Sequence, residues 1–221
     1  HEHYYRNAYL DCVRAVDFIK SREKADKDAI FAAGGSQGGC FTYVAAGLTQ
    51  AFRAIAPSIT GHADFTDGRD SQLATPEFLD AQAALGYTDE ERDVFNSYYD
   101  TMNFASRVNC PVITCFSLQD TTDPAHTNIA PYNLLVNVDE KDKEYIITPF
   151  LGHSTPADWT QTYMDFFEKY IGTPLPPTGI ETITTDNGNG ENAPMYNIAG
   201  MKVGKDYKGI VIQNGKKRVK K

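Results

Sequence analysis

One glycine-rich segment constrains the fold of this chain more than any other part of its sequence. The letters GGSQGG occupy positions 34–39, directly after the apolar run AIFAAG at 29–34. A buried strand that turns at once into a helix needs glycines where the two backbones approach each other. The segment therefore predicts a sharp turn that lifts the Ser36 hydroxyl above the end of a strand. A phosphate-cradling loop or a plain tight turn stays open, although no P-loop lysine follows and the G-x-G-x-x-G register is missing.

The rest of the chain alternates between helical and strand patterns. Thr75 and Pro76 mark one helix start, and a capping box from Thr88 to Glu91 marks another. The other predicted elements are helices at 4–20, 37–49, 125–136 and 156–171 and strands at 29–34, 52–59, 111–117 and 144–149. This alternation predicts an α/β fold with a mainly parallel sheet, whose functional loops lie at the carboxyl ends of the strands.

Two candidate partners of Ser36 follow later strands. Asp120 comes just after the strand at 111–117, and His153 comes just after the strand at 144–149. The chain order Ser, Asp, His, with each residue following a strand, is that of the α/β-hydrolase fold. Asp123 is a competing acid, but Asp120 lies closer to the strand end.

These residue types suit acyl transfer through a serine. A histidine with a pKa near neutrality can take the Ser36 proton and return it to a leaving alcohol, which assigns His153 as the general base and acid. Asp120 would hold the imidazole tautomer, and the N–H of Gln37 would donate to the oxyanion. Ser36 would attack an ester carbonyl and form an acyl-enzyme that water then cleaves.

The other histidines and the cysteines predict no metal site and no cofactor. His1 and His3 stand at the terminus, His126 is expected at the surface, and His62 could line a pocket. No histidine or carboxylate cluster has metal-ligand spacing, and no C-x-x-C pair occurs. The four cysteines are expected to be buried free thiols, because cysteine buries readily; they are Cys12, Cys40, Cys110 and Cys115.

Charge and composition divide the chain into three predicted parts. Residues 1–171 form the α/β domain, residues 172–193 are a linker rich in Pro, Gly and Asn, and residues 194–221 are a small β-hairpin tail. The net charge is −8, but the tail alone contains eight Lys or Arg and one Asp. The acidic body argues against a nucleic-acid partner. No run of 18 apolar residues exists, so no membrane span is predicted.

Several segments together resemble the acetyl xylan esterase / cephalosporin-C deacetylase family. They are YYRNAYLDCVRAVDF, GGSQGG, YYDTMNFASRVNCPVITCFSLQDTTDP and the GH of LGH, and they extend from about residue 4 to residue 171. The resemblance implies deacetylation of acetylated xylo-oligosaccharides or similar small acetyl esters. It also implies the triad of Ser36, Asp120 and His153, Gln37 in the oxyanion hole, and a homo-oligomer in the full-length form.

The chain departs from this family in two ways. Ser154 stands where members usually have a Glu, which affects a contact behind the triad histidine. The family also has an N-terminal half before the helix at residue 4, so we expect this chain to be a C-terminal fragment. Its strand at 29–34 should then be an exposed sheet edge, and its activity alone should be weak or absent.

The tail resembles the C-terminal sorting segments of secreted Bacteroidetes proteins. It has a Y-N-x-x-G-x-x-V start, a G-I-V-I strand and a Lys-rich end. The resemblance implies a secreted, cell-surface or periplasmic protein. An accessory hairpin or a disordered basic tail is the alternative for this segment.

Two other functions stay open for the whole chain. One is a serine peptidase of the prolyl-oligopeptidase kind, which uses the same G-x-S-x-G-G turn and the same residue order. The other is a non-catalytic fragment or binding module, in which Ser36 would have no chemical role.

Overall fold

The computed structural model describes residues 3–67 and 76–173 and parts of the tail, namely 195–197, 202–204, 206–213 and 216–220. The chain divides into two compact units, His1–Thr178 and Gly179–Lys221. The predicted helix cap Thr75, most of the predicted linker and His1 lie outside the described residues.

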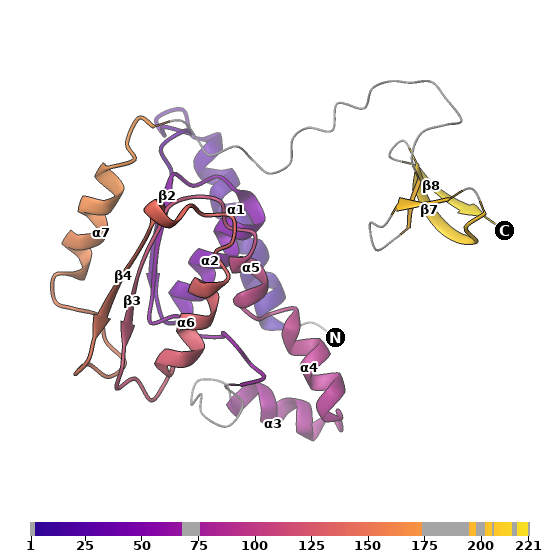
Figure 1. Cartoon of the computed structure of the whole chain (residues 1–221), viewed down its shortest axis with the longest axis horizontal. Helices are drawn as coiled ribbons and strands as arrows, with labels where there is room; N and C mark the ends of the chain where they lie inside the picture. The colour runs from indigo at the N-terminus through magenta and orange to yellow at the C-terminus, as the bar shows by residue number, and fades with distance from the viewer. Residues whose placement is uncertain are drawn as a thin grey trace. The chain divides into compact units, whose positions relative to one another are not determined.

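The first unit is built on four parallel strands in the order β1-β2-β3-β4 (Figure 1). They are β1 (Phe31–Gly35), β2 (Ala54–Ser58), β3 (Val112–Ser117) and β4 (Lys143–Thr148). Their register aligns the carboxyl ends, because Gly35 pairs with Ser58, Ser58 with Cys115, and Ser117 with Thr148. The loops after β1, β3 and β4 therefore leave from the same edge of the sheet. The predicted α/β fold with a parallel sheet is confirmed.

Helices cover both faces of this sheet. Figure 1 shows α7 (Trp159–Glu168) on one face and α1 (Tyr4–Ser21), α2 (Gln37–Thr49) and α6 (Ala125–Asn133) on the other. Alternate residues of β2 pack against the two layers: Ile55 belongs to the core with α1 and α2, while Ala54 and Ala56 belong to the core with α7. Because β2 and β3 are buried on both faces, their sequences are mainly apolar and do not alternate with exposed polar residues.

The strand that leads to Ser36 lies at an edge of the sheet, as expected. Within the described residues β1 pairs only with β2, and β4 forms the opposite edge. The remaining helical elements of the unit are α3 (Pro76–Ala84), α4 (Asp89–Ser97), α5 (Met102–Ala105) and the short 3₁₀ helix η2 (Glu140–Asp142). α5 was not predicted, because one helical turn is too short to show a 3.6-residue period.

Two predicted helices are shorter in the structure. α6 ends at Asn133 rather than at 136, because Leu134 leaves the helical conformation and the next residue, Leu135, turns into the core, where it is fully buried. α7 begins at Trp159 rather than at 156. The segment before it forms a turn in which the Trp159 N–H donates to the Pro156 carbonyl at 3.0 Å.

Helix α4 begins with the predicted capping box. The Glu91 N–H donates to Thr88 Oγ1 at 3.2 Å, and the Thr88 N–H donates to Glu91 Oε2 at 2.9 Å. Replacing Thr88 with alanine removes one of these bonds and should cost about 1 kcal/mol of local stability. Amide hydrogen exchange in α4 should then become about fivefold faster. Thr88→Ser keeps the hydroxyl and should exchange like the parent; equal exchange in Thr88→Ala would contradict this role.

The second unit is more than the hairpin that its sequence predicts. It contains β5 (Met195–Asn197), β6 (Lys202–Val203), β7 (Gly209–Gln213) and β8 (Lys216–Lys220), in the antiparallel order β6-β5-β7-β8. β7 and β8 form the expected hairpin. A two-stranded hairpin alone is marginal in water, and here β5 adds Met195, which is buried like Val211 of β7.

Candidate functional site

The backbone at Ser36 is held in a strained turn between β1 and α2. Ser36 has φ 57° and ψ −122°, a conformation that non-glycine residues rarely adopt. Its N–H donates to the Ser58 carbonyl at 2.9 Å, and its own carbonyl accepts the N–H of Gly39 at 2.9 Å and that of Gly61 at 3.1 Å. These bonds fix the conformation from both sides.

Glycine is required at two positions of this turn by close approach. A Cβ at Gly34 would lie 2.4 Å from the Gly38 carbonyl oxygen. A Cβ at Gly39 would lie 2.9 Å from the Ser58 carbonyl oxygen. Both contacts are with backbone that cannot move aside cheaply, so strand and helix can meet at Ser36 only if these residues have no side chain.

The loops after β3 and β4 are tied to each other. The Leu118 N–H donates to the Thr148 carbonyl, and the Gln119 N–H donates to the Leu151 carbonyl, both at 3.1 Å. The Ser117 hydroxyl donates to the Ser154 carbonyl at 2.6 Å. Asp120 and His153 are therefore positioned by one bonded network.

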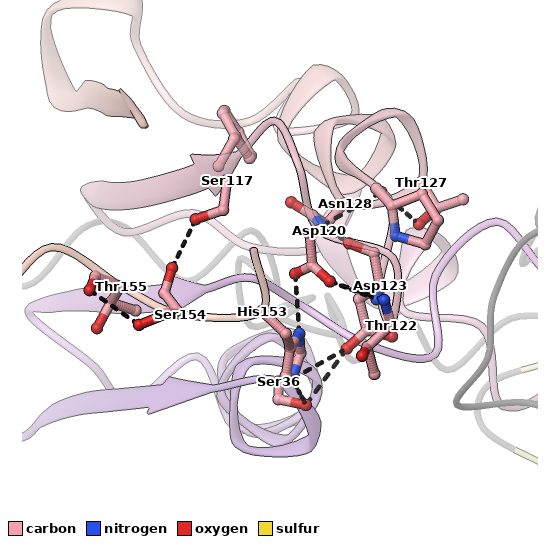
Figure 2. Close-up of polar contacts among 12 residues, drawn as sticks. Ser36, Ser117, Asp120, Thr122, Asp123, Thr127, Asn128, His153, Ser154 and Thr155 are labelled. Carbon is pink, nitrogen blue, oxygen red and sulfur yellow. Dashed lines mark hydrogen bonds and ion pairs between the residues drawn. The ribbon is translucent and has the colours of Figure 1, made fainter. Parts of the chain in front are cut away.

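Ser36, His153 and Asp120 form a continuous chain of polar contacts (Figure 2). His153 Nε2 lies 2.9 Å from Ser36 Oγ, and His153 Nδ1 lies 2.8 Å from Asp120 Oδ2. The other carboxylate oxygen of Asp120, Oδ1, accepts the N–H groups of Thr122 and Asp123, both at 2.9 Å. The Asp120 carboxylate is fully buried, whereas the imidazole is 29% exposed. The three residues are 117 positions apart in sequence at most, yet they meet at the carboxyl ends of three strands.

Asp123 also reaches this chain of contacts. The Ser36 hydroxyl lies 3.3 Å from Asp123 Oδ2, and the same oxygen lies 3.9 Å from His153 Nε2. The Asp123 carboxylate is fully buried, and its Oδ1 has no hydrogen-bond partner within the described residues. Burial raises the pKa of Asp123 to about 6, although nearby His153 opposes this shift. Sequence order ranked Asp123 below Asp120 but could not place it against Ser36.

The raised pKa of Asp123 predicts a dependence of stability on pH. Between pH 4 and pH 6 the folded chain holds a proton that the unfolded chain has lost, so the contribution of Asp123 to stability is lost as pH rises through about 6. Asp123→Asn removes this loss, so its free energy of unfolding should exceed that of the parent by about 3 kcal/mol above pH 6 and by less near pH 4. Thermal melts across this range test it. A difference that does not change with pH would contradict it.

Gln37 lies at the first position of α2, where backbone N–H groups have no acceptor within the helix. Its side chain donates from Nε2 to the Tyr5 hydroxyl at 2.7 Å, and that hydroxyl lies 3.1 Å from His62 Nε2. Tyr5 lies in the helix predicted at 4–20, but no pattern in the sequence pairs it with Gln37. His62 is buried beneath Tyr5, and burial lowers the pKa of His62 to about 4.

Comparisons with known proteins identify the family of this chain. The model of the acetyl xylan esterase (AXE1) family matches residues 1–170. The chain belongs to the acetyl xylan esterase family. The acetyl esterase Axe7A of Xylanibacter ruminicola is 31% identical to it over 181 residues. That alignment covers 76% of this chain and 37% of Axe7A.

Solved structures place this member of the acetyl xylan esterase family in the α/β-hydrolase fold. The acetyl xylan esterase from Paenibacillus sp. R4 superposes with a TM-score of 0.68 at 32% identity, covering 76% of this chain and 54% of that one. The acylaminoacyl peptidase of Pyrococcus horikoshii superposes with a TM-score of 0.57 at 20% identity, covering 73% and 27%. The chain thus spans about half or less of these proteins, and the fold alone does not separate esterase from peptidase.

A pocket of about 470 Å³ borders the nucleophile turn of this family member. Its walls include Gly35, Ser36, Ile59, Trp159 and Tyr163. The aromatic residues come from α7, on the face of the sheet opposite α2, and the polar wall comes from the turn itself. A pocket of this size beside a serine hydroxyl can hold a small acyl group or part of a sugar.

The remaining candidate residues lie away from the triad. His126 is half exposed and lies 3.6 Å from Asp67, and His3 packs on Tyr5, Phe95 and Tyr99. The four cysteines are free; three are buried as expected, but Cys12 is only partly buried. Within the described ranges no group of three or more His, Cys, Asp or Glu is placed to hold a metal ion. Across the same ranges, no helix combines the length and the apolar character of a membrane span.

Proposed function

We propose that this chain provides the nucleophile, base and acid of a serine carbohydrate esterase that removes acetyl groups from acetylated xylan, xylo-oligosaccharides or similar small esters. The observation that supports it most is the contact chain from Ser36 Oγ through both nitrogens of His153 to Asp120, at 2.9 and 2.8 Å. Membership of the acetyl xylan esterase family and the acetyl esters named for its relatives support the substrate class.

Each residue has one role in the proposed reaction. His153 Nε2 takes the Ser36 proton as Ser36 Oγ attacks the acetyl carbonyl carbon, and then gives that proton to the departing sugar hydroxyl. Asp120 accepts from His153 Nδ1–H, which leaves Nε2 free as the base. The Gln37 N–H donates to the carbonyl oxygen as it gains negative charge. Water then attacks the acetyl carbon as His153 Nε2 takes its proton. The bond to Ser36 Oγ breaks, Oγ receives that proton, and acetate leaves.

Acetate release from acetylated xylo-oligosaccharides tests this proposal, together with the hydrolysis rates of p-nitrophenyl acetate, longer-chain esters and a peptide substrate. We would use this chain alone and the joined protein, which is this chain fused to the amino-terminal half of a family member. The proposal expects activity on acetyl esters in the joined protein, with a clear preference for acetyl. Peptide cleavage without ester preference would favour a peptidase, and a folded joined protein with no hydrolysis would favour a binding module.

Export and self-association are separate proposals. The basic tail supports a secreted, cell-surface or periplasmic location, and the family resemblance supports a homo-oligomer of the full-length protein. Fractionation of cells that express the protein with and without residues 194–221, followed by size measurement of the purified product, tests both. If the protein without residues 194–221 is exported as well as the full chain, the proposed role of the tail in export is contradicted.

A further inference from the structure

The proposed hydrolysis needs one carboxylate beside the histidine, yet two are present. Asp120 contacts His153 Nδ1, while Asp123 lies on the other side of the ring, 3.9 Å from Nε2 and 3.3 Å from Ser36 Oγ. The Asp123 side chain is fully buried, so it does not contact solvent. It packs closely against Gly61, where an added Cβ would lie only 3.0 Å from its Oδ2.

The Ser36 hydroxyl has one hydrogen and two acceptors within reach. When His153 is neutral and donates from Nδ1 to Asp120, its Nε2 is an acceptor, and the hydroxyl hydrogen points to it at 2.9 Å. When His153 is protonated, Nε2 becomes a donor and can no longer accept. The Ser36 hydroxyl then donates its hydrogen bond to Asp123 Oδ2, which lies 3.3 Å from Oγ, while His153 Nε2–H donates to Ser36 Oγ.

Asp123 therefore favours the imidazolium form in two ways. It accepts the hydrogen bond of the Ser36 hydroxyl, which the protonated Nε2 can no longer accept. Its negative charge also lies within 4 Å of the positive ring. We propose that Asp123 is a positioning residue that stabilises the protonated form of His153 and so sets the lower pH limit of the site. The inference concerns the pKa of His153 and rests on the proposed function only where that pKa becomes a limit on activity.

The groups around Asp123 leave few other sources for such an effect. His153, from the loop after β4, and Asp120, from the same loop as Asp123, are the charged groups that act on its carboxylate. The loop after β2 presents the backbone of Gly61, and the turn before α2 presents the Ser36 hydroxyl. Burial raises the pKa of Asp123 to about 6, so its carboxylate carries its charge at neutral pH.

The imidazole of His153 can be titrated directly by NMR in the full chain with isotope-labelled histidine. The His153→Gln variant assigns its resonance among the five histidines. Asp123→Asn keeps the size of the side chain and removes its charge, and should lower the pKa of His153 by about one pH unit. Asp123→Ser removes the same charge with a smaller side chain and should also lower the pKa of His153.

Asp139→Asn is the matched control for the loss of one negative charge. Asp139 is exposed and precedes η2, so it lies at the amino end of β4, whereas His153 follows the carboxyl end. This variant should leave the pKa of His153 unchanged. Equal pKa values of His153 in the parent, Asp123→Asn and Asp123→Ser would overturn the proposal.

The pH profile of kcat/KM gives the second measurement. In Asp123→Asn the acid limb should move to lower pH by about the same one unit, because more acid is needed to protonate a weaker base. A purely structural role of Asp123 would lower activity at every pH without moving the limb. This profile is measured on the joined protein. If the NMR shift appears but the folded joined protein shows no hydrolysis, the inference stands and the proposed function fails. If the joined protein hydrolyses acetyl esters but neither the pKa of His153 nor the acid limb moves, the proposed function stands and the inference fails.

Discussion

Ser36→Ala should lower the rate of acetyl ester hydrolysis on the order of 10⁴-fold or more. The reason is geometric, because Ser36 Oγ is the atom that His153 Nε2 contacts at 2.9 Å, and no other hydroxyl of the described residues shares that contact. Without Oγ no acyl-enzyme can form, and only binding and the oxyanion donors remain. The measurement is kcat/KM with p-nitrophenyl acetate, made on the joined protein described above.

Ser21→Ala is the control for this loss. Ser21 ends α1, and its hydroxyl donates to the Phe18 carbonyl on the exposed surface before β1. It therefore lies at the amino end of the sheet, and its variant should keep full activity. A Ser36→Ala protein that folds and retains more than about a tenth of the parent rate would show that hydrolysis occurs elsewhere.

Asp120→Asn should have the second largest effect, about 10⁴-fold in kcat at neutral pH. Asp120 Oδ1 accepts two backbone N–H groups, so in the variant that position must be taken by the amide oxygen. The amide NH₂ then faces His153 Nδ1, which must become an acceptor, and the imidazole proton moves to Nε2. In this tautomer Nε2 cannot take the Ser36 proton.

Asp123→Asn is the comparison that decides between the two carboxylates. It should keep most of the activity at its optimum pH while shifting the acid limb. If Asp123→Asn abolished hydrolysis and Asp120→Asn did not, Asp123 rather than Asp120 would be the acid of the triad. The rate of hydrolysis should be measured at several pH values. At a single pH, a shifted acid limb and the loss of a catalytic group would both appear as a lower rate.

The sheet and its carboxyl-end loops could be predicted because burial determines the sequence of a parallel strand. The segments that form β2 and β3 are fully buried on both faces, so their residues are mainly apolar without a strict alternation. The turn at Ser36 could also be predicted, since the close approach of Gly34 to Gly38 excludes a Cβ. Helix ends were less predictable: α6 ends where Leu135 enters the core, which is a tertiary contact.

The contacts within the site were only partly visible in the sequence. Chain order points to Asp120 and His153 because each follows a strand, but the side of the imidazole on which Asp123 lies depends on the path of the loop at 118–124. The bond from Gln37 to Tyr5 joins α2 to α1 and arises from helix packing. The tail sequence indicated a hairpin, but the pairing of β5 with β7 depends on residues far apart in that segment.

Covalent catalysis through Ser36 requires that an acyl-enzyme form on this residue. The protein is mixed with p-nitrophenyl acetate, stopped within the first turnover by acid, digested and analysed by mass spectrometry. We expect the peptide containing Ser36 to gain the mass of one acetyl group. Ser36→Ala should gain none, and Ser21→Ala should gain it as the parent does. Rapid hydrolysis with no acetyl group on that peptide, or equal acetylation in Ser36→Ala, would contradict a covalent mechanism through Ser36.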